Sequence, residues 1–485
     1  MTKQCQAVVF VGLLVVAFAL LRFVNLDADF ALTSKMGGVA FTDEGWYANS
    51  AIRFVTGQDW YQAGDFNPAV VMPLGQIIYL PLLKIFGVGL ETLRLVAALA
   101  SVIGAALMGR VASKERGVMA GLFTALLILL NYEVFIFSRL AIVEPLGIAF
   151  ACAAFLFAVS NEGVLYKKAV IAGIFSTFAI LTKSNMIFIV PVTMLAPLLV
   201  RDVALSCRLK VAAITMLVPL VVVLCHQMII ATFFGPDQAL FRQINFVNRL
   251  VDGPKGWFIS VVQLGYNFVV FYPALAAYVS VSLIFITIVS RPFWRNRLVQ
   301  LLLAWVIAYL FILSFFIYKP SRYFLPLVAP LSMLAILATF QLREDAAALK
   351  VALLYKAQLL MTLVYMGVSG ALIAFYMATP QYSWRDMTLE VGRIIAAPSN
   401  PSPLLIGNIA DAIAAQTGVP AMNSLLVSGD LRARISARHP SYAIVMLGDP
   451  DARLDDIRAV GGTAHLEKSW QVYARGRFPG REVSL

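Results

Sequence analysis

Long apolar runs separated by short basic loops constrain this chain more than any other feature of its sequence. A helix that crosses a bilayer needs roughly 20 consecutive, mostly apolar residues. The first such run covers Ala7 to Val24, lacks a clean A-x-A cleavage site and is longer than a signal-peptide core, so we expect it to anchor the chain. Ten further runs begin near Leu95, Val118, Pro145, Ala169, Asn185, Val211, Phe271, Leu298, Phe324 and Val351.

Composition supports the same interpretation. Hydrophobic residues make up 60% of the 485 residues and charged residues only 13%, whereas soluble proteins are about a quarter charged. The net charge of +12 does not indicate nucleic-acid binding, because the surplus lies in short loops between apolar runs. No cysteine pair has metal-ligand spacing or suggests a disulfide framework. The sequence therefore predicts an all-α polytopic membrane protein with about 11 transmembrane helices.

Loop charges orient the predicted helices. With a cytoplasmic N-terminus, the inner turns carry 14 basic and five acidic residues, as the positive-inside rule requires. This arrangement holds only if the apolar segment Pro73 to Leu90 does not span. That segment is short and contains Pro81 and Lys84, so we expect an interfacial or re-entrant helix on the outer face.

Composition changes after Tyr376. From Thr379 onward, apolar runs PLLIGNI, SYAIVML and WQVYA alternate with helical stretches IADAIAAQ and DARLDDIRAV, a pattern typical of a small α/β domain. We therefore expect a transmembrane domain over 1–378, with a long first outer loop over 25–94, and an extracytoplasmic α/β domain over 379–485.

Polar and charged side chains gather on the predicted outer face. The first outer loop is too long for a simple connection and contains Asp43-Glu44. Around it, other outer-face segments contribute one further acidic residue and several cations. This set is Arg139, Glu144, Lys183, Arg242, Lys319 and Arg322. Such a surface suits a sugar donor whose lipid tail lies in the bilayer and whose phosphate lies at the interface. A carboxylate can take the proton of an acceptor hydroxyl while cations neutralise the leaving phosphate.

These residues also carry a family resemblance. Asp43-Glu44-x-x-Tyr47-Ala48, followed by Gly57, Asp59-Trp60, Pro73-Leu74, Phe86-Gly87 and Arg94-Leu95, resembles the first outer loop of GT-C glycosyltransferases. The pattern is most similar to the protein O-mannosyltransferase-like family and the aminoarabinose transferases of lipid A. Ser138-Arg139 with Glu144-Pro145 is similar to that family's second acidic motif, and Lys319 to Pro326 resembles its late Arg-Tyr motif.

The resemblance implies an inverting transferase that moves a sugar from a polyprenyl-phosphate carrier to a lipid, glycan or protein acceptor outside the cytoplasm. It implies that Asp43 is the catalytic carboxylate, with Glu44 beside it, and that Glu144 supports the acceptor or orients Asp43. By the same resemblance, Arg322 or Lys319 would hold the donor phosphate. Tyr323 and the outer-face cations Arg139, Lys183 and Arg242 are further candidates for the phosphate site. No cofactor is predicted with certainty, no metal ligand is assigned, and the need for a divalent metal is left open.

One element departs from the family. Where the aminoarabinose transferases have an acidic–Lys–Pro element, this chain has Asp65-Phe66-Asn67-Pro68, so the resemblance does not carry their sugar specificity over. The sequence identifies neither the sugar nor the acceptor.

Structural interpretations compete for several residues. Asp43-Glu44 could cap an interfacial helix, and Arg139 with Glu144 could form a structural ion pair. Lys183 could reach toward the interface beside an apolar run. Arg322-Tyr323 could anchor a span at the interface, and Arg242 could contact anionic lipid headgroups.

Two other function classes compete with a transferase. A lipid-linked-sugar flippase or another transporter would favour internal repeats and ionisable groups near mid-membrane, but this sequence shows no repeat and its acidic residues cluster at one surface. A membrane anchor for a partner-binding tail would not need eleven spans. We therefore expect a glycosyltransferase of a bacterial plasma membrane, with its C-terminal domain in the periplasm and membrane lipids, but no nucleic acid, among its partners.

Overall fold

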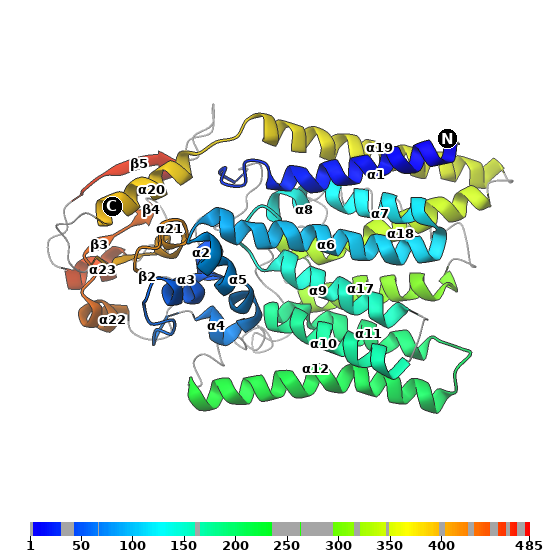
Figure 1. Ribbon diagram of the computed structural model, residues 1–485, viewed down its shortest axis with the longest axis horizontal. Coiled ribbons are helices and arrows are strands. Elements are labelled where there is room, and N and C mark those ends of the chain that lie inside the picture. The colour runs from blue at the N-terminus through cyan, green and yellow to red at the C-terminus, as the bar shows by residue number, and fades with distance from the viewer. Residues whose placement is uncertain are drawn as a thin grey trace.

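A bundle of long helices carries a cap of shorter helices and strands at one end, and the N-terminus lies at the opposite end (Figure 1). This computed structural model describes residues 3–30, 43–65, 67–160, 165–234, 262, 294–314, 321–345, 349–396, 403–424, 431–446, 454–461, 466–472 and 481–485.

Within these ranges, ten predicted spans coincide with bundle helices. Seven helical segments are long and apolar enough to cross a membrane, whereas the bundle segments Val118–Leu130, Glu144–Val159 and Ser184–Leu198 are shorter. The predicted span near Phe271 lies outside the described residues. The bundle helices are α1 (Lys3–Leu20), α6 (Leu90–Arg116), α7 (Val118–Leu130), α9 (Glu144–Val159), α10 (Leu165–Thr182), α11 (Ile189–Leu198), α12 (Leu205–Phe233), α17 (Arg297–Ser314), α18 (Leu325–Glu344) and α19 (Leu349–Ala378).

Small residues allow the antiparallel helices α6 and α7 to approach closely. A Cβ atom on Gly109 would lie 2.9 Å from the Gly121 carbonyl oxygen, and one on Gly121 would lie 2.6 Å from the Gly109 oxygen. Only glycine fits at both positions, as is common where membrane helices pack backbone to backbone. The turn between the helices is at Gly117, whose φ of 83° suits a residue without a side chain.

The first outer loop forms one half of the cap. It contains the short helices α2 (Glu44–Trp46), α3 (Asn49–Val55) and α4 (Pro68–Val71), and then α5 (Pro73–Phe86). Helix α5 covers most of the segment expected to be interfacial, and it lies with α2 to α4 at the end of the bundle (Figure 1). At 14 residues, α5 is shorter than the roughly 20 residues of a bilayer-spanning helix, as α7, α9 and α11 also are, but α5 lies in the cap and not in the bundle (Figure 1).

The C-terminal residues form the other half of the cap. Helices α20 (Ser383–Ile395), α21 (Ala410–Thr417), α22 (Leu431–Arg438) and α23 (Leu454–Gly461) accompany two small sheets. In one sheet, strands β1 (Leu405–Gly407), β2 (Ala421–Asn423) and β3 (Tyr442–Ala443) are parallel in the order β2-β1-β3. In the other, β4 (Val445–Met446), β5 (Ser469–Val472) and β6 (Arg481–Ser484) are antiparallel in the order β4-β6-β5.

The α/β character predicted after α19 is therefore confirmed, and strands and helices form in the runs expected to contain them. The two halves of the cap nevertheless share one apolar core. A single cluster of buried side chains includes Ile52 from α3, Phe137 beside the bundle, and Ile413 and Val483 from the C-terminal residues. The C-terminal residues are thus packed onto the first outer loop and do not hang from α19 as a free unit.

A buried carboxylate fastens this junction. Asp29 accepts hydrogen bonds from the Ser383 hydroxyl at 3.0 Å and from the backbone N–H groups of Trp384 at 2.8 Å and Arg385 at 3.1 Å. These N–H groups lie in the first turn of α20 and have no partner within the helix. Asp29 therefore caps α20 from a remote part of the chain.

Candidate functional site

Four charged side chains from four separate segments meet where the bundle joins the cap. They are Asp43 directly before α2, Glu144 at the start of α9, Lys183 directly after α10, and Arg322 in the turn of 3-10 helix before α18. All four are nearly inaccessible: Glu144 is fully buried and the other three are at most 7% exposed. Each was a candidate from the sequence, and the fold brings them into one cluster.

Arg322 links the two acidic residues. Its Nη2 lies 2.6 Å from Asp43 Oδ2, and its Nε donates to Glu144 Oε1 at 3.0 Å. Lys183 Nζ pairs with the same Glu144 oxygen. Because a buried charge is costly unless it is paired, the two cations and two carboxylates stabilise one another, and their formal charges sum to zero.

Two tyrosines surround Lys183. Its Nζ donates to the Tyr47 hydroxyl at 2.7 Å, and it lies 4.8 Å and 5.3 Å from the ring centroids of Tyr47 and Tyr323. Burial raises the pKa of Tyr47 above its usual range, so its hydroxyl remains neutral. The sequence motifs nominated Tyr323 for the site but not Tyr47. The available signal was spacing, since Tyr47 follows Asp43 by four residues, one helical turn away.

The cluster has unused hydrogen-bonding capacity. Arg322 Nη1 and Glu144 Oε2 are buried and have no hydrogen-bond partner among the described residues. Buried polar atoms of this kind are rare in folded proteins and usually contact water, an ion or a ligand. One unused donor and one unused acceptor therefore mark the cluster as a place where a polar ligand can bind.

Glu44 points away from this cluster. Its two carboxylate oxygens accept from Arg94 Nε and Nη2, both at 2.8 Å, and Oε1 also accepts from the Ala141 backbone N–H at 2.7 Å. Arg94 also donates to the carbonyl oxygens of Leu26 and Ala28. Glu44 thus fixes the turn that carries Asp43 but has no free oxygen directed at the four-residue cluster.

Arg139 also lies apart from the cluster. Its guanidinium donates to the carbonyl oxygens of Leu21, Arg22 and Asn25, at the end of the first bundle helix. This geometry matches the structural interpretation of Arg139 but without the ion pair to Glu144, whose partners are Lys183 and Arg322. The two other expected phosphate ligands, Lys319 and Arg242, lie outside the described residues.

In the described part of the chain, no three His, Cys, Asp or Glu side chains converge. Asp43 and Glu144 are connected through a guanidinium group, so the positive charge between them comes from Arg322.

Comparison with known proteins identifies this architecture. Residues 71–229 match the family described as dolichyl-phosphate-mannose-protein mannosyltransferase. ArnT from Cupriavidus metallidurans, in crystal structures bound to undecaprenyl phosphate and in the apo state, aligns with 97–98% of this chain and 97% of its own, at a TM-score of 0.61 and 17–18% identity. No curated protein sequence matches the chain.

An oligosaccharyltransferase is also similar. The enzyme from Archaeoglobus fulgidus, in complex with Zn and sulfate, aligns with 84% of this chain and 62% of its own, at a TM-score of 0.54 and 17% identity. A structure of the Archaeoglobus fulgidus protein AglB with an inhibitory peptide and a dolichol-phosphate aligns at a TM-score of 0.51. These likenesses show the fold: the chain has the GT-C architecture that its first-loop motif predicted.

Proposed function

We propose that this protein is an inverting glycosyltransferase that moves a sugar from a polyprenyl-phosphate carrier to a hydroxyl acceptor on the outer face of the membrane. The buried cluster of Asp43, Glu144, Lys183 and Arg322 carries the proposal. It combines an acidic group next to two cations with an unused donor on Arg322. That combination suits the transfer of a group whose leaving atom belongs to a phosphate.

Carrier recognition is assigned to the two cations. Arg322 Nη1 is available for a phosphate oxygen. Lys183 lies beside Arg322, because both side chains donate to Glu144 Oε1. The related structures support a carrier of this class, since ArnT was crystallised with undecaprenyl phosphate and AglB with a dolichol-phosphate. Tyr323, whose ring lies 5.3 Å from Arg322 Cζ and from Lys183 Nζ, shields this pair on one side.

The transfer follows from the charges. Asp43 takes the proton of the acceptor hydroxyl as that oxygen forms a bond to the anomeric carbon of the sugar. The bond from that carbon to the carrier phosphate oxygen breaks, and its electron pair leaves with the phosphate. A single displacement of this kind inverts the anomeric configuration. The resting cluster is neutral and becomes +1 when Asp43 is protonated, while the phosphate gains one negative charge.

Glu144 and Glu44 receive supporting roles in this proposal. Glu144 holds both cations through Oε1 and presents Oε2 to a polar group of the substrate. Glu44 holds the Asp43 turn on the bundle through Arg94 and the Ala141 N–H. We further propose a bacterial plasma membrane with the cap in the periplasm, because the predicted basic turns lie away from the cap.

Purified protein reconstituted in vesicles tests the function. The donor pool would contain several polyprenyl-phosphate sugars, and the products would be glycosylated acceptor and free polyprenyl phosphate in equal amounts. Nuclear magnetic resonance of the product should show inverted anomeric configuration. If the protein moves labelled donor across the vesicle membrane without releasing polyprenyl phosphate, the transporter alternative replaces the transferase. A product with retained configuration would exclude the single displacement.

A further inference from the structure

Helix α21 of the C-terminal residues lies directly against the turn that carries Asp43. A Cβ atom on Gly45 would lie 2.1 Å from the carbonyl carbon of Asp411 and 2.3 Å from the backbone nitrogen of Ala412. These are backbone atoms, which cannot move aside as a flexible side chain can. Only a glycine at position 45 therefore permits this contact between α2 and α21.

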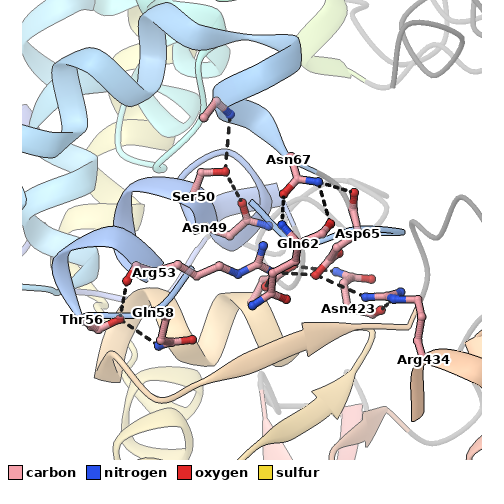
Figure 2. A network of polar contacts seen from close by, with 12 residues as sticks. Asn49, Ser50, Arg53, Thr56, Gln58, Gln62, Asp65, Asn67, Asn423 and Arg434 are labelled. Atoms are coloured by element: carbon pink, nitrogen blue, oxygen red, sulfur yellow. Dashed lines mark hydrogen bonds and ion pairs between the residues drawn. The ribbon is translucent and has the colours of Figure 1, made fainter. Parts of the chain in front are cut away.

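Charged side chains from the first outer loop and the C-terminal residues meet beside this contact. Arg53 from α3 places Nη2 2.6 Å from Asp65 Oδ2 and 3.8 Å from Asp411 Oδ1. Arg434 from α22 places Nη2 3.5 Å from the same Asp65 oxygen, as Figure 2 shows for its labelled members Arg53, Asp65 and Arg434. We call Arg53, Asp65, Asp411 and Arg434 the junction cluster. Two of its members belong to the first outer loop and two to the C-terminal residues.

Amide side chains hold the junction cluster in shape. Asn67 donates to the carbonyl oxygens of Gln62 and Asp65 and accepts from the Gln62 N–H, all at 2.8–2.9 Å (Figure 2). On the other side, Asn423 Nδ2 donates to Asp411 Oδ2 at 3.0 Å. Asn67 stands in the element that departs from the aminoarabinose transferases, and here it stabilises the turn that presents Asp65.

The turn with Asp43 is thus held from two directions. On the bundle side, Glu44 is bound by Arg94 and the Ala141 N–H. On the other side, Gly45 rests on the α21 backbone. Asp43 lies one residue before Glu44 and two before Gly45, so a displacement of α21 changes the position of its carboxylate relative to Arg322.

We propose that the C-terminal residues contribute to the transfer site. Helix α21 supports the turn that carries Asp43, and Gly45 and Arg434 are positioning residues. This inference rests on the proposed transferase function and assigns a role to the part of the chain beyond α19. Gly45 acts through its close contact with the Asp411 backbone. Arg434 acts through Asp65, which fixes the first outer loop against the C-terminal residues.

A glycine substitution tests the contact in the full-length protein. Gly45→Ala forces a Cβ atom into the α21 backbone, whereas Gly367→Ala in α19 adds one where no atom lies within 4 Å. Because a misplacement of about 1 Å can cost about 100-fold in rate, we expect Gly45→Ala to lower kcat by about that factor. Its affinity for undecaprenyl phosphate should stay within about threefold of wild type, and Gly367→Ala should match wild type in both.

Hydrogen exchange gives a readout that does not need turnover. Undecaprenyl phosphate should slow exchange in residues 43–47 and in α21 together in wild type and in Gly367→Ala, but only weakly in α21 of Gly45→Ala. This coupling is measurable even if the wild type transfers no sugar, so its presence or absence is independent of the fate of the proposed function. Equal kcat and equal exchange in the two glycine variants would overturn the proposal.

A second pair of variants covers the case in which Gly45→Ala does not fold. Arg434→Gln removes a charge from the junction cluster, and Arg434→Lys keeps the charge. We expect Arg434→Gln to lower kcat by about three- to tenfold with unchanged affinity for undecaprenyl phosphate, and Arg434→Lys to restore most of the loss. A parallel loss of affinity and kcat in both variants, or no loss in either, would contradict a positioning role.

Discussion

Replacing Arg322 by lysine separates the charge of this residue from its shape. The guanidinium contacts Asp43 through Nη2 at 2.6 Å and Glu144 through Nε at 3.0 Å, two different nitrogen atoms of one planar group. A lysine has a single nitrogen and cannot reproduce this fork. Arg322→Lys therefore retains the positive charge but loses at least one charge-assisted hydrogen bond in a buried site.

The expected effect follows from the value of that bond. A hydrogen bond to a charged group contributes about 1.5–3 kcal/mol, and each 1.36 kcal/mol corresponds to a factor of about ten in rate. Arg322→Lys should therefore lower kcat/KM by about 10- to 150-fold. Initial rates measured over a range of donor concentrations, together with equilibrium binding of the carrier, would assign the loss to transfer or to binding.

Arg343 provides the matched control. Helix α18 begins just after the turn that carries Arg322, and Arg343 lies near the other end of this helix, where its side chain is exposed. Arg343→Lys should leave all kinetic constants unchanged. If Arg322→Lys retains kcat/KM within about threefold of wild type, the bridging role of the guanidinium is refuted.

Three further substitutions test the surrounding contacts. Glu44→Gln removes the charge that balances Arg94 in a buried pair, so thermal unfolding should show a loss of about 3 kcal/mol or more; an unchanged melting temperature would contradict the anchoring role. Lys183→Met keeps the length of the side chain but removes one of the two cations, and equilibrium binding of undecaprenyl phosphate should weaken at least about tenfold; equal affinity would exclude Lys183 from the phosphate site. Burial and the neighbouring Asp65 raise the pKa of Asp411 to about 6 from 3.8, although Arg53 and hydrogen bonds from Asn423 and Asn49 oppose the shift. The folded protein thus holds this proton more tightly than the unfolded chain. Protonated Asp411 therefore stabilises the fold fully below about pH 4, and this stabilisation is lost as the pH rises through about 6. The difference corresponds to about 3 kcal/mol, and Asp411→Asn should unfold at a higher temperature than wild type at pH 7.5 and show a flatter pH dependence between about pH 4 and 6; parallel curves for the two proteins would refute this assignment.

The sequence was informative about the bundle because bilayer thickness imposes a minimum length on each apolar run. Loop charges, with Pro81 and Lys84, argued against Pro73 to Leu90 as a span, and α5 lies in the cap with α2 to α4 (Figure 1). Asp43 could be nominated from the motif of the first outer loop, and Glu144, Lys183 and Arg322 because each lies at the outer end of an apolar run. Their membership of one cluster depends on helix packing, which the order of motifs along the chain does not specify.

Side-chain direction could not be predicted. Glu44 and Arg139 have the same residue types and spacing that the transferase motifs require, yet one turns to Arg94 and the other to carbonyl groups at the end of α1. The contact between Gly45 and Asp411 leaves no local signal at all, because the two residues lie in different halves of the cap. Only the folded chain shows why position 45 must be glycine.

Asp43→Asn in a single-turnover reaction tests the central claim most directly. The variant keeps the shape of the side chain and its place beside Arg322 but cannot accept a proton. With the donor bound in advance and acceptor added in excess, the account predicts normal donor binding and a transfer rate lowered by at least about 100-fold, in line with the contribution of a general base. A variant that transfers sugar at close to the wild-type rate would contradict the role of Asp43 and, with it, the proposed chemistry of the cluster.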